Sequence, residues 1–184
     1  MVSAFRRTDA CYDPRHTILD DRAAAYRDAA RLYCGLIESH RQLSRAAFVK
    51  ELEPSLAFLY YTGSRLPDVR FTASSDSQPE DKRKDVFPGL LVSLSAFLRD
   101  YDVYQEMFDP LDLTDTPVTG HLAGDLAEIY EDSMSNLKLL DHLAEDALWD
   151  VRFSFTNHWA RHVASALRVV SALVHYHYAS EADD

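Results

Sequence analysis

The sequence predicts an all-α protein, an antiparallel bundle of four to five helices, and three observations support this prediction. Apolar residues recur every three or four positions over most of the chain, which is the spacing of one face of a helix. No segment alternates apolar and polar residues between hairpin turns, as the strands of a sheet do. Alanine is abundant, whereas the 184 residues include only 5 glycines. We therefore expect helices that pack antiparallel and are joined by loops.

Length and composition predict one domain. A chain of 21.0 kDa buries about 70% of its unfolded surface, which is enough for a core without metal or disulfide staples. We expect an irregular N-terminal arm over residues 1–19, a single helical domain over residues 20–179 and an acidic tail over residues 180–184.

The first two helices have recognisable starts. The first should begin near Asp20 or Asp21, because either aspartate can cap the free N–H groups. Its apolar face then consists of Tyr26, Ala30, Tyr33 and Ile37.

Ser44 is a candidate cap for the second helix and Gly63 a candidate stop. Because Pro54 lacks an N–H and clashes with the preceding turn, we expect the second helix to be kinked or split.

Two loops flank the third helix. Residues 67–85 are polar and contain two prolines and a mixed charge cluster, so they form the longest predicted loop. The third helix should begin near Pro88, a favourable first-turn residue. The segment that includes Tyr104 and Phe108 should end at a turn at Asp109, and residues 109–119 form the second loop.

The last two helices carry the candidate site. The fourth is expected over about residues 119–140, and the fifth from about residue 145 to residue 178. At 1.5 Å per residue the fifth helix would be about 50 Å long, which is long for a domain of this size. We therefore expect a break or bend near residues 154–156.

The charge balance argues against some partners. The chain has 19 basic and 30 acidic residues, a net charge of −11. We expect no nucleic acid and no membrane as a partner, because nucleic acids and anionic bilayers attract basic surfaces. No apolar stretch is long enough for a transmembrane helix. Cys11 and Cys34 lack a CxxC spacing, so we expect reduced thiols and a cytoplasmic protein.

The first candidate patch is the run His158-Trp159-Ala160-Arg161-His162. Histidines four residues apart share one face of a helix, the spacing that bidentate metal capture needs. A zincin helix has Glu directly after its first histidine, whereas Trp159 stands here, so the protease interpretation fails. Because His162 falls on the apolar face and His158 at its edge, at least one imidazole should need a hydrogen-bond partner.

The second candidate patch is formed by Asp125, Glu128 and Asp132 on the fourth helix. Asp125 and Asp132 are two turns apart on one row, and Glu128 neighbours both. In the simpler interpretation, one of these aspartates accepts a hydrogen bond from His158 or His162 and ties two helices together. In the alternative, a divalent metal ion is held by Asp125, Asp132, His158 and His162.

We favour the hydrogen bond over the metal ion and therefore expect no cofactor, with a divalent metal as the alternative. The ligand-binding or structural candidates are Asp125, Glu128, Asp132, His158, Trp159 and His162. No catalytic residue can be named from the sequence.

Four motifs, taken in order, resemble a known family. Residues 125–132, DLAEIYED, resemble a D-L-A-x-I-Y-x-D motif, and residues 158–167 resemble H-W-x-x-H-x-x-x-A-L. Upstream, the pairs at residues 59–60 and 66–67 and the run at residues 108–110 fit the same pattern. Over about residues 28–173 the chain resembles an uncharacterised bacterial family known only as a domain of unknown function. The resemblance implies an all-helical cytosolic bacterial protein and no particular activity.

The sequence departs from that family pattern at two positions. Gly124 stands where the family usually has a second acid, and Glu131 stands where it usually has a basic residue. If the acid pair serves a metal ion in the family, this member should bind the ion more weakly.

Three functions are open. The first, which we favour, is a non-enzymatic interaction or adaptor module with a protein partner or self-association, because no specific catalytic signature is present and the surface is acidic. The second is a metal- or small-ligand-binding bundle, with or without enzymatic activity, that uses the 125–132 acids and the 158/162 histidines. The third is a structural role for both patches, with function elsewhere, for example in the 67–85 loop.

Overall fold

The structure, a computed structural model, describes residues 14–69, 87–107, 109–141 and 145–177. The elements are α1 (Pro14–Glu38), η1 (His40–Gln42), α2 (Arg45–Ser64), α3 (Phe87–Leu98), η3 (Arg99–Tyr101), β1 (Val103–Glu106), β2 (Val118–His121), α4 (Leu122–Asp141), α5 (Glu145–Ser154), η4 (Phe155–Trp159), α6 (Ala160–Ala172) and η5 (Leu173–His177). The rest of the predicted 67–85 loop, most of the N-terminal arm and the acidic tail lie outside the described residues.

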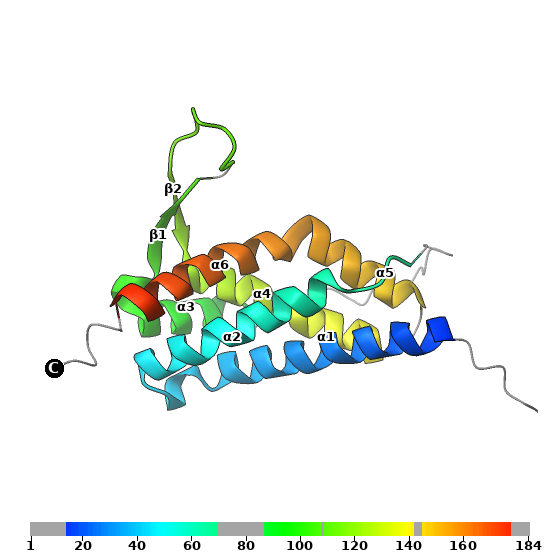
Figure 1. The fold of residues 1–184 in the computed structure, drawn as a ribbon. Helices are drawn as coiled ribbons and strands as arrows, with labels where there is room; N and C mark the ends of the chain where they lie inside the picture. Colours follow the sequence, from blue (N-terminus) through cyan, green and yellow to red (C-terminus); the bar gives the residue numbers. More distant parts are fainter. Residues whose placement is uncertain (1–13, 70–86, 108, 142–144, 178–184) are drawn as a thin grey trace, which may run out of the picture.

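The bundle is built from α1, α2, α4 and α6. Helix α1 packs against α2 and α4, and α6 packs against the same two helices. Each of these helices runs antiparallel to its neighbours, and α3 lies beside α4 at one end (Figure 1). The predicted all-α bundle is therefore confirmed. Within the described residues, no helix combines the length and the apolar character needed to cross a bilayer.

The core between these helices contains buried tyrosines whose hydroxyl groups are hydrogen-bonded. Tyr33 donates to the carbonyl oxygen of Leu126 at 2.8 Å, and the Tyr26 hydroxyl oxygen accepts from Asn136 at 3.0 Å. Burial raises the pKa of both tyrosines above its ordinary value. Trp159 is fully buried beside Tyr26, with the ring centroids 5.9 Å apart.

Several predicted boundaries need correction. Helix α1 begins at Pro14 rather than near Asp20, so the last part of the predicted irregular arm is helical.

Ser44 caps α2 as predicted, because its side chain accepts from the N–H of Ala47. Helix α2 is not split at Pro54. Pro54 lies on the exposed face, where water can hydrogen-bond the carbonyl group that proline leaves without a donor.

Gly63 has a packing role instead of the predicted stop. Helix α2 ends one residue later, and no described glycine has a positive φ. A Cβ atom on Gly63 would lie 2.8 Å from the Phe155 ring and 3.0 Å from the Trp159 ring. The absence of a side chain therefore lets α2 approach the segment that carries one of the candidate histidines.

The expected long fifth helix is interrupted by a π-helical turn where the sequence predicted a break or bend. Helix α5 ends at Ser154, and a π-helical turn, η4, follows before α6 begins. Turns of this kind in a helix frequently occur at functional sites. Here the π-helical turn contains His158.

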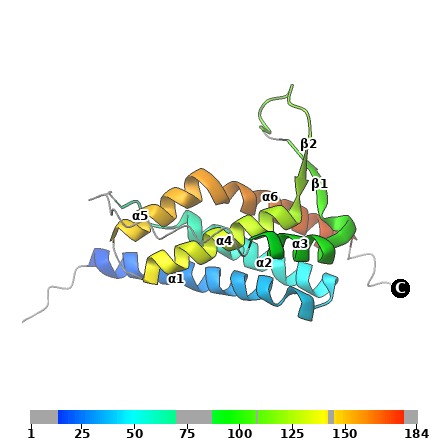
Figure 2. The same cartoon turned by 180° about the vertical axis from the view of Figure 1, so that it is seen from behind.

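The prediction of no strands is wrong for one short segment. β1 and β2 pair antiparallel, with Tyr104 opposite Gly120. Residues 103–107 and 109–121, which we call the hairpin, project from one end of the bundle (Figure 2). Tyr104 was expected to belong to the segment that continues the third helix, but α3 ends at Leu98 and Arg99 has a φ of 55°. Strands of four residues are too short for their alternation to stand out from a helical pattern.

Candidate functional site

Two helical segments bring the predicted site residues together. Asp125, Glu128 and Asp132 lie on α4, whereas His158 lies in η4 and His162 in α6. Because α4 packs against both η4 and α6, acids from one segment face histidines from the other. The result is two separate Asp–His pairs, whereas the sequence predicted a hydrogen bond from one of the histidines to one of the aspartates.

Asp125 and His162 form the pair that we call the closed pair. His162 Nδ1 lies 2.8 Å from Asp125 Oδ1, and the Tyr104 hydroxyl donates to Asp125 Oδ2 at 2.5 Å. Both carboxylate oxygens therefore have a donor. The side chain of His162 is only 20% exposed. Burial, followed by the hydrogen bond to Asp125, raises the pKa of Tyr104 above its ordinary value.

The hairpin holds Tyr104 over Asp125. A Cβ atom on Gly120 would lie only 2.3 Å from the Tyr104 ring, so the ring occupies the space that a side chain would need. From α6, the Arg168 guanidinium lies 5.7 Å from the centre of the same Tyr104 ring. Tyr104 was not among the predicted site residues. A glycine paired with an aromatic residue across two strands is the signal that could have identified it.

Asp102 anchors the start of the hairpin to α4. Its carboxylate accepts from the N–H of Ala123 and from the hydroxyl of Ser95, each at 2.7 Å. Its carbonyl oxygen accepts from the N–H of Leu122 at 2.7 Å. Two of the free N–H groups at the beginning of α4 are thus satisfied by the residue that precedes β1.

Asp132 and His158 form the second pair, which we call the open pair. His158 Nδ1 lies 2.8 Å from Asp132 Oδ2, and Ser154 donates to Asp132 Oδ1 at 3.3 Å. The His158 side chain is 42% exposed, about twice the value of His162. Glu128 lies close by, and one ligand atom from each of Glu128, Asp132 and His158 falls within 4.8 Å of the others.

The four residues proposed as metal ligands are not assembled around one point. Asp125 and Asp132 are seven residues apart, which is about 10.5 Å along a helix. Among the described residues, the group with three side chains in reach of one ion is Glu128, Asp132 and His158. Asp125 and His162 are outside it, whereas Glu128, one of the acids of the predicted metal- or ligand-binding bundle but not one of these four residues, is inside it.

Trp159 belongs to the core rather than to a ligand site. Its side chain is fully buried, and its ring packs against Phe155 with centroids 4.7 Å apart. The indole N–H has no hydrogen-bond partner within the described part of the chain. Trp159 therefore supports the turn that carries His158 without reaching the surface.

A family model described as a domain of unknown function (DUF5063) matches residues 17–177. The chain belongs to this family. The crystal structure of protein BF1032 from Bacteroides fragilis is similar to this DUF5063 protein, with a TM-score of 0.71 and 19% sequence identity. The similarity covers 86% of this chain and 96% of that chain, and it shows the fold alone. A comparison with curated proteins finds no match.

The tip of the hairpin is a second candidate site in this DUF5063 protein. The sequence predicted a loop here but did not single out its leucines. Leu111 and Leu113 are 88% and 96% exposed, the highest values among the large exposed apolar side chains of the described residues. In Figure 1 the tip stands well away from the helices. We use the term hairpin tip for residues 109–117.

Proposed function

We propose that this DUF5063 protein is a protein-interaction module whose docking element is the hairpin tip. The observation that carries the proposal is the exposure of Leu111 and Leu113, two residues apart, on an element that projects from the bundle. Single exposed leucines are common on protein surfaces, whereas neighbouring ones on a projecting element are typical of contact sites.

Hydrogen bonds within the tip support a preformed shape. The carboxylate of Asp109 accepts from the N–H of Leu111, and that of Asp112 accepts from the N–H of Thr114, both at 2.9 Å. Asp115 accepts from the N–H of Asp109 at 3.0 Å. The hydroxyl and N–H of Thr114 lower the pKa of Asp112. A loop that is ordered before binding loses less conformational entropy when it docks.

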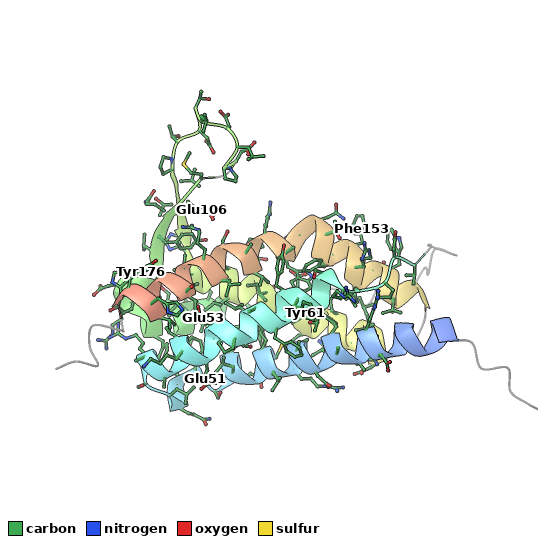
Figure 3. All side chains as sticks on the ribbon, in the orientation of Figure 1. Glu51, Glu53, Tyr61, Glu106, Phe153 and Tyr176 are labelled. Atoms are coloured by element: carbon green, nitrogen blue, oxygen red, sulfur yellow. The ribbon has the colours of Figure 1, made fainter. Side chains whose placement is uncertain are left out.

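The foot of the hairpin is anchored to α6. Ser165 donates to Glu106 at 2.7 Å, and Arg168 donates to the carbonyl oxygen of Gln105 at 3.2 Å. Figure 3 labels Glu106 at this junction between hairpin and bundle. The anchored foot favours a hairpin that presents its tip in a defined direction.

The chemistry of the tip specifies the kind of partner. Leu111 and Leu113 alternate with Asp109, Asp112 and Asp115, so a matching surface has an apolar cleft with basic side chains around it. Burial of each leucine would contribute about 1.5–3 kcal/mol to the gross binding free energy. Basic groups at the rim would mainly increase the rate of association.

The test compares chemical cross-linking in cells of the native host for the wild-type chain and for a Leu111→Ser/Leu113→Ser variant. A Leu32→Ser/Val92→Ser variant is the control, because it removes exposed apolar side chains from α1 and α3 instead. We expect one defined partner protein to be cross-linked by the wild-type and control proteins and to be at least tenfold reduced with the tip variant. Equal cross-linking by all three proteins would contradict the proposal.

A further inference from the structure

We propose that Glu128, Asp132 and His158 bind one divalent transition-metal ion between α4 and η4. This site is separate from the hairpin tip, and the inference does not depend on the interaction function. It differs from the four-residue set predicted from the sequence, because it replaces Asp125 and His162 by Glu128.

The spacing of the three side chains suits one ion. Glu128 and Asp132 are four residues apart on α4 and therefore share a face of that helix. His158 meets them from η4, and the three ligand atoms lie within 4.8 Å of one another. Nitrogen and oxygen ligands bind Zn²⁺ at about 2.0–2.2 Å, so two ligands on one ion are about 3–4 Å apart. Binding therefore requires the side chains of Glu128 and His158 to rotate toward Asp132, which is the most buried of the three.

The distance between the two atoms of the open pair is also compatible with a bound metal ion. His158 Nδ1 and Asp132 Oδ2 are 2.8 Å apart. Two adjacent ligands on one ion are separated by only slightly more, so an ion can replace the proton that the two atoms share. The combination of one imidazole and two carboxylates suits Zn²⁺ or Mn²⁺ better than Ca²⁺, which prefers oxygen ligands alone.

The charge of the site favours a cation. Two carboxylates lie within 4.8 Å of each other, and like charges at that distance repel. Glu128 has neither a hydrogen bond nor an ion pair with any other described residue. A divalent ion would neutralise both carboxylates and give Glu128 a partner. Three protein ligands would leave the remaining coordination positions to water.

The closed pair provides an internal control for metal binding. Asp125 and His162 have the same residue types on the same two helical segments, but no third ligand from the described residues joins them. Tyr104 already donates to the second carboxylate oxygen of Asp125. A substitution in the closed pair should therefore leave the ion at the open pair in place.

The sample is the metal-free 184-residue chain without a histidine tag. Binding of Mn²⁺ is followed by electron paramagnetic resonance, and binding of Zn²⁺ is measured in competition with a chromophoric chelator. The variants are Glu128→Gln and His158→Gln, with His162→Gln as the matched control. We expect one equivalent of ion bound by the wild type and by His162→Gln, and affinity at least tenfold weaker in Glu128→Gln and His158→Gln.

Glu128→Gln keeps the test valid if the histidine variants unfold, because Glu128 has no described partner that its replacement would leave unpaired. Absence of binding by the folded wild type would overturn the inference. Equal affinity in the wild type and Glu128→Gln would also overturn it, since the ion would then lie at another site. Loss of binding in His162→Gln, with the protein folded and Glu128→Gln unaffected, would overturn it in favour of the closed pair.

Discussion

The closed pair and the open pair consist of the same two residue types, on the same two helical segments, with the same Nδ1 to carboxylate distance of 2.8 Å. Their surroundings differ. The hairpin places the Tyr104 hydroxyl on Asp125, whereas the neighbour on α4 places the Glu128 carboxylate close to Asp132. The hydroxyl of Tyr104 completes the first pair at 2.5 Å, whereas the second pair has a longer hydrogen bond from Ser154, 3.3 Å, and a second negative charge beside it.

On this comparison we infer that an Asp–His pair takes its role from the residues around it. Where the neighbour donates a hydrogen bond, the carboxylate is satisfied and the pair ties secondary-structure elements together. Where the neighbour is another carboxylate, unbalanced charge is left that a cation would neutralise. The predictions below test whether the two pairs differ in this way.

The largest expected effect is on the closed pair. Asp125→Ala removes the acceptor of both His162 and Tyr104, so we expect the free energy of unfolding to fall by about 3 kcal/mol. Asp132→Ala in the open pair should cost about 1 kcal/mol, because its histidine is more exposed and water can replace the lost acceptor. Urea unfolding measures both values. Equal losses in the two variants would remove the distinction between the pairs.

Gly120→Ala should disturb the closed pair from a distance. The new Cβ atom would lie 2.3 Å from the Tyr104 ring and push the hydroxyl away from Asp125, at a cost of about 2 kcal/mol in the free energy of unfolding. Gly35→Ala is the control, since nothing lies within 4 Å of its new Cβ atom. Within helix α1 that change should stabilise by about 0.5–1 kcal/mol. Urea unfolding that shows no difference between the two variants would contradict the role of Gly120.

Alkaline pH should expose the Tyr104 contact of the closed pair. The folded protein raises the pKa of Tyr104, so the unfolded chain loses that proton at lower pH than the folded chain does. The stability from this tyrosine is therefore complete below pH 10 and is lost as the pH rises further. Cys34 acts in the same sense, because burial raises its pKa from 9.0 to about 12.

The loss of stability above pH 9 can be followed by urea unfolding at a series of pH values. In Tyr104→Phe the loss between pH 10 and pH 11 should be smaller than in the wild type. An identical loss in both proteins would show that Tyr104 is not held more tightly protonated by the fold.

The smallest expected effect is at Glu128. In the metal-free protein, Glu128→Gln removes a negative charge near Asp132 and breaks no described hydrogen bond. We expect the free energy of unfolding to stay the same or to rise by up to about 0.5 kcal/mol. A decrease of more than about 1 kcal/mol in thermal or urea unfolding would show that Glu128 has a structural role instead.

Much of this arrangement could be predicted from the sequence, because it depends on periodicity. The spacing of Asp125 and Asp132 on one helix and of His158 and His162 on the next predicts acids facing histidines. The excessive length of the last helix predicts a break or bend near residues 154–156, where the π-helical turn η4 lies. The Ser44 cap follows from residue type alone.

The features that distinguish the two pairs could not be predicted in this way. Tyr104 reaches Asp125 through a pairing of two four-residue strands, a contact that no local pattern encodes. The grouping of Glu128 with Asp132 instead of Asp125 depends on which turn of α4 faces His158, and thus on packing between helices. Gly63 suggested a helix stop because glycine is common at helix ends. Its actual packing against Trp159 joins distant parts of the chain, so no local pattern in the sequence indicates it.

The most direct test of the difference between the two pairs is thermal unfolding of metal-free Asp125→Asn, Asp132→Asn and the wild type, each with and without added Zn²⁺. We expect Zn²⁺ to raise the Tm of the wild type and of Asp125→Asn by several degrees and to leave the Tm of Asp132→Asn unchanged. Without Zn²⁺, Asp125→Asn should have a lower Tm than the wild type. A rise that is lost in Asp125→Asn and kept in Asp132→Asn, or no rise in the wild type, would contradict it.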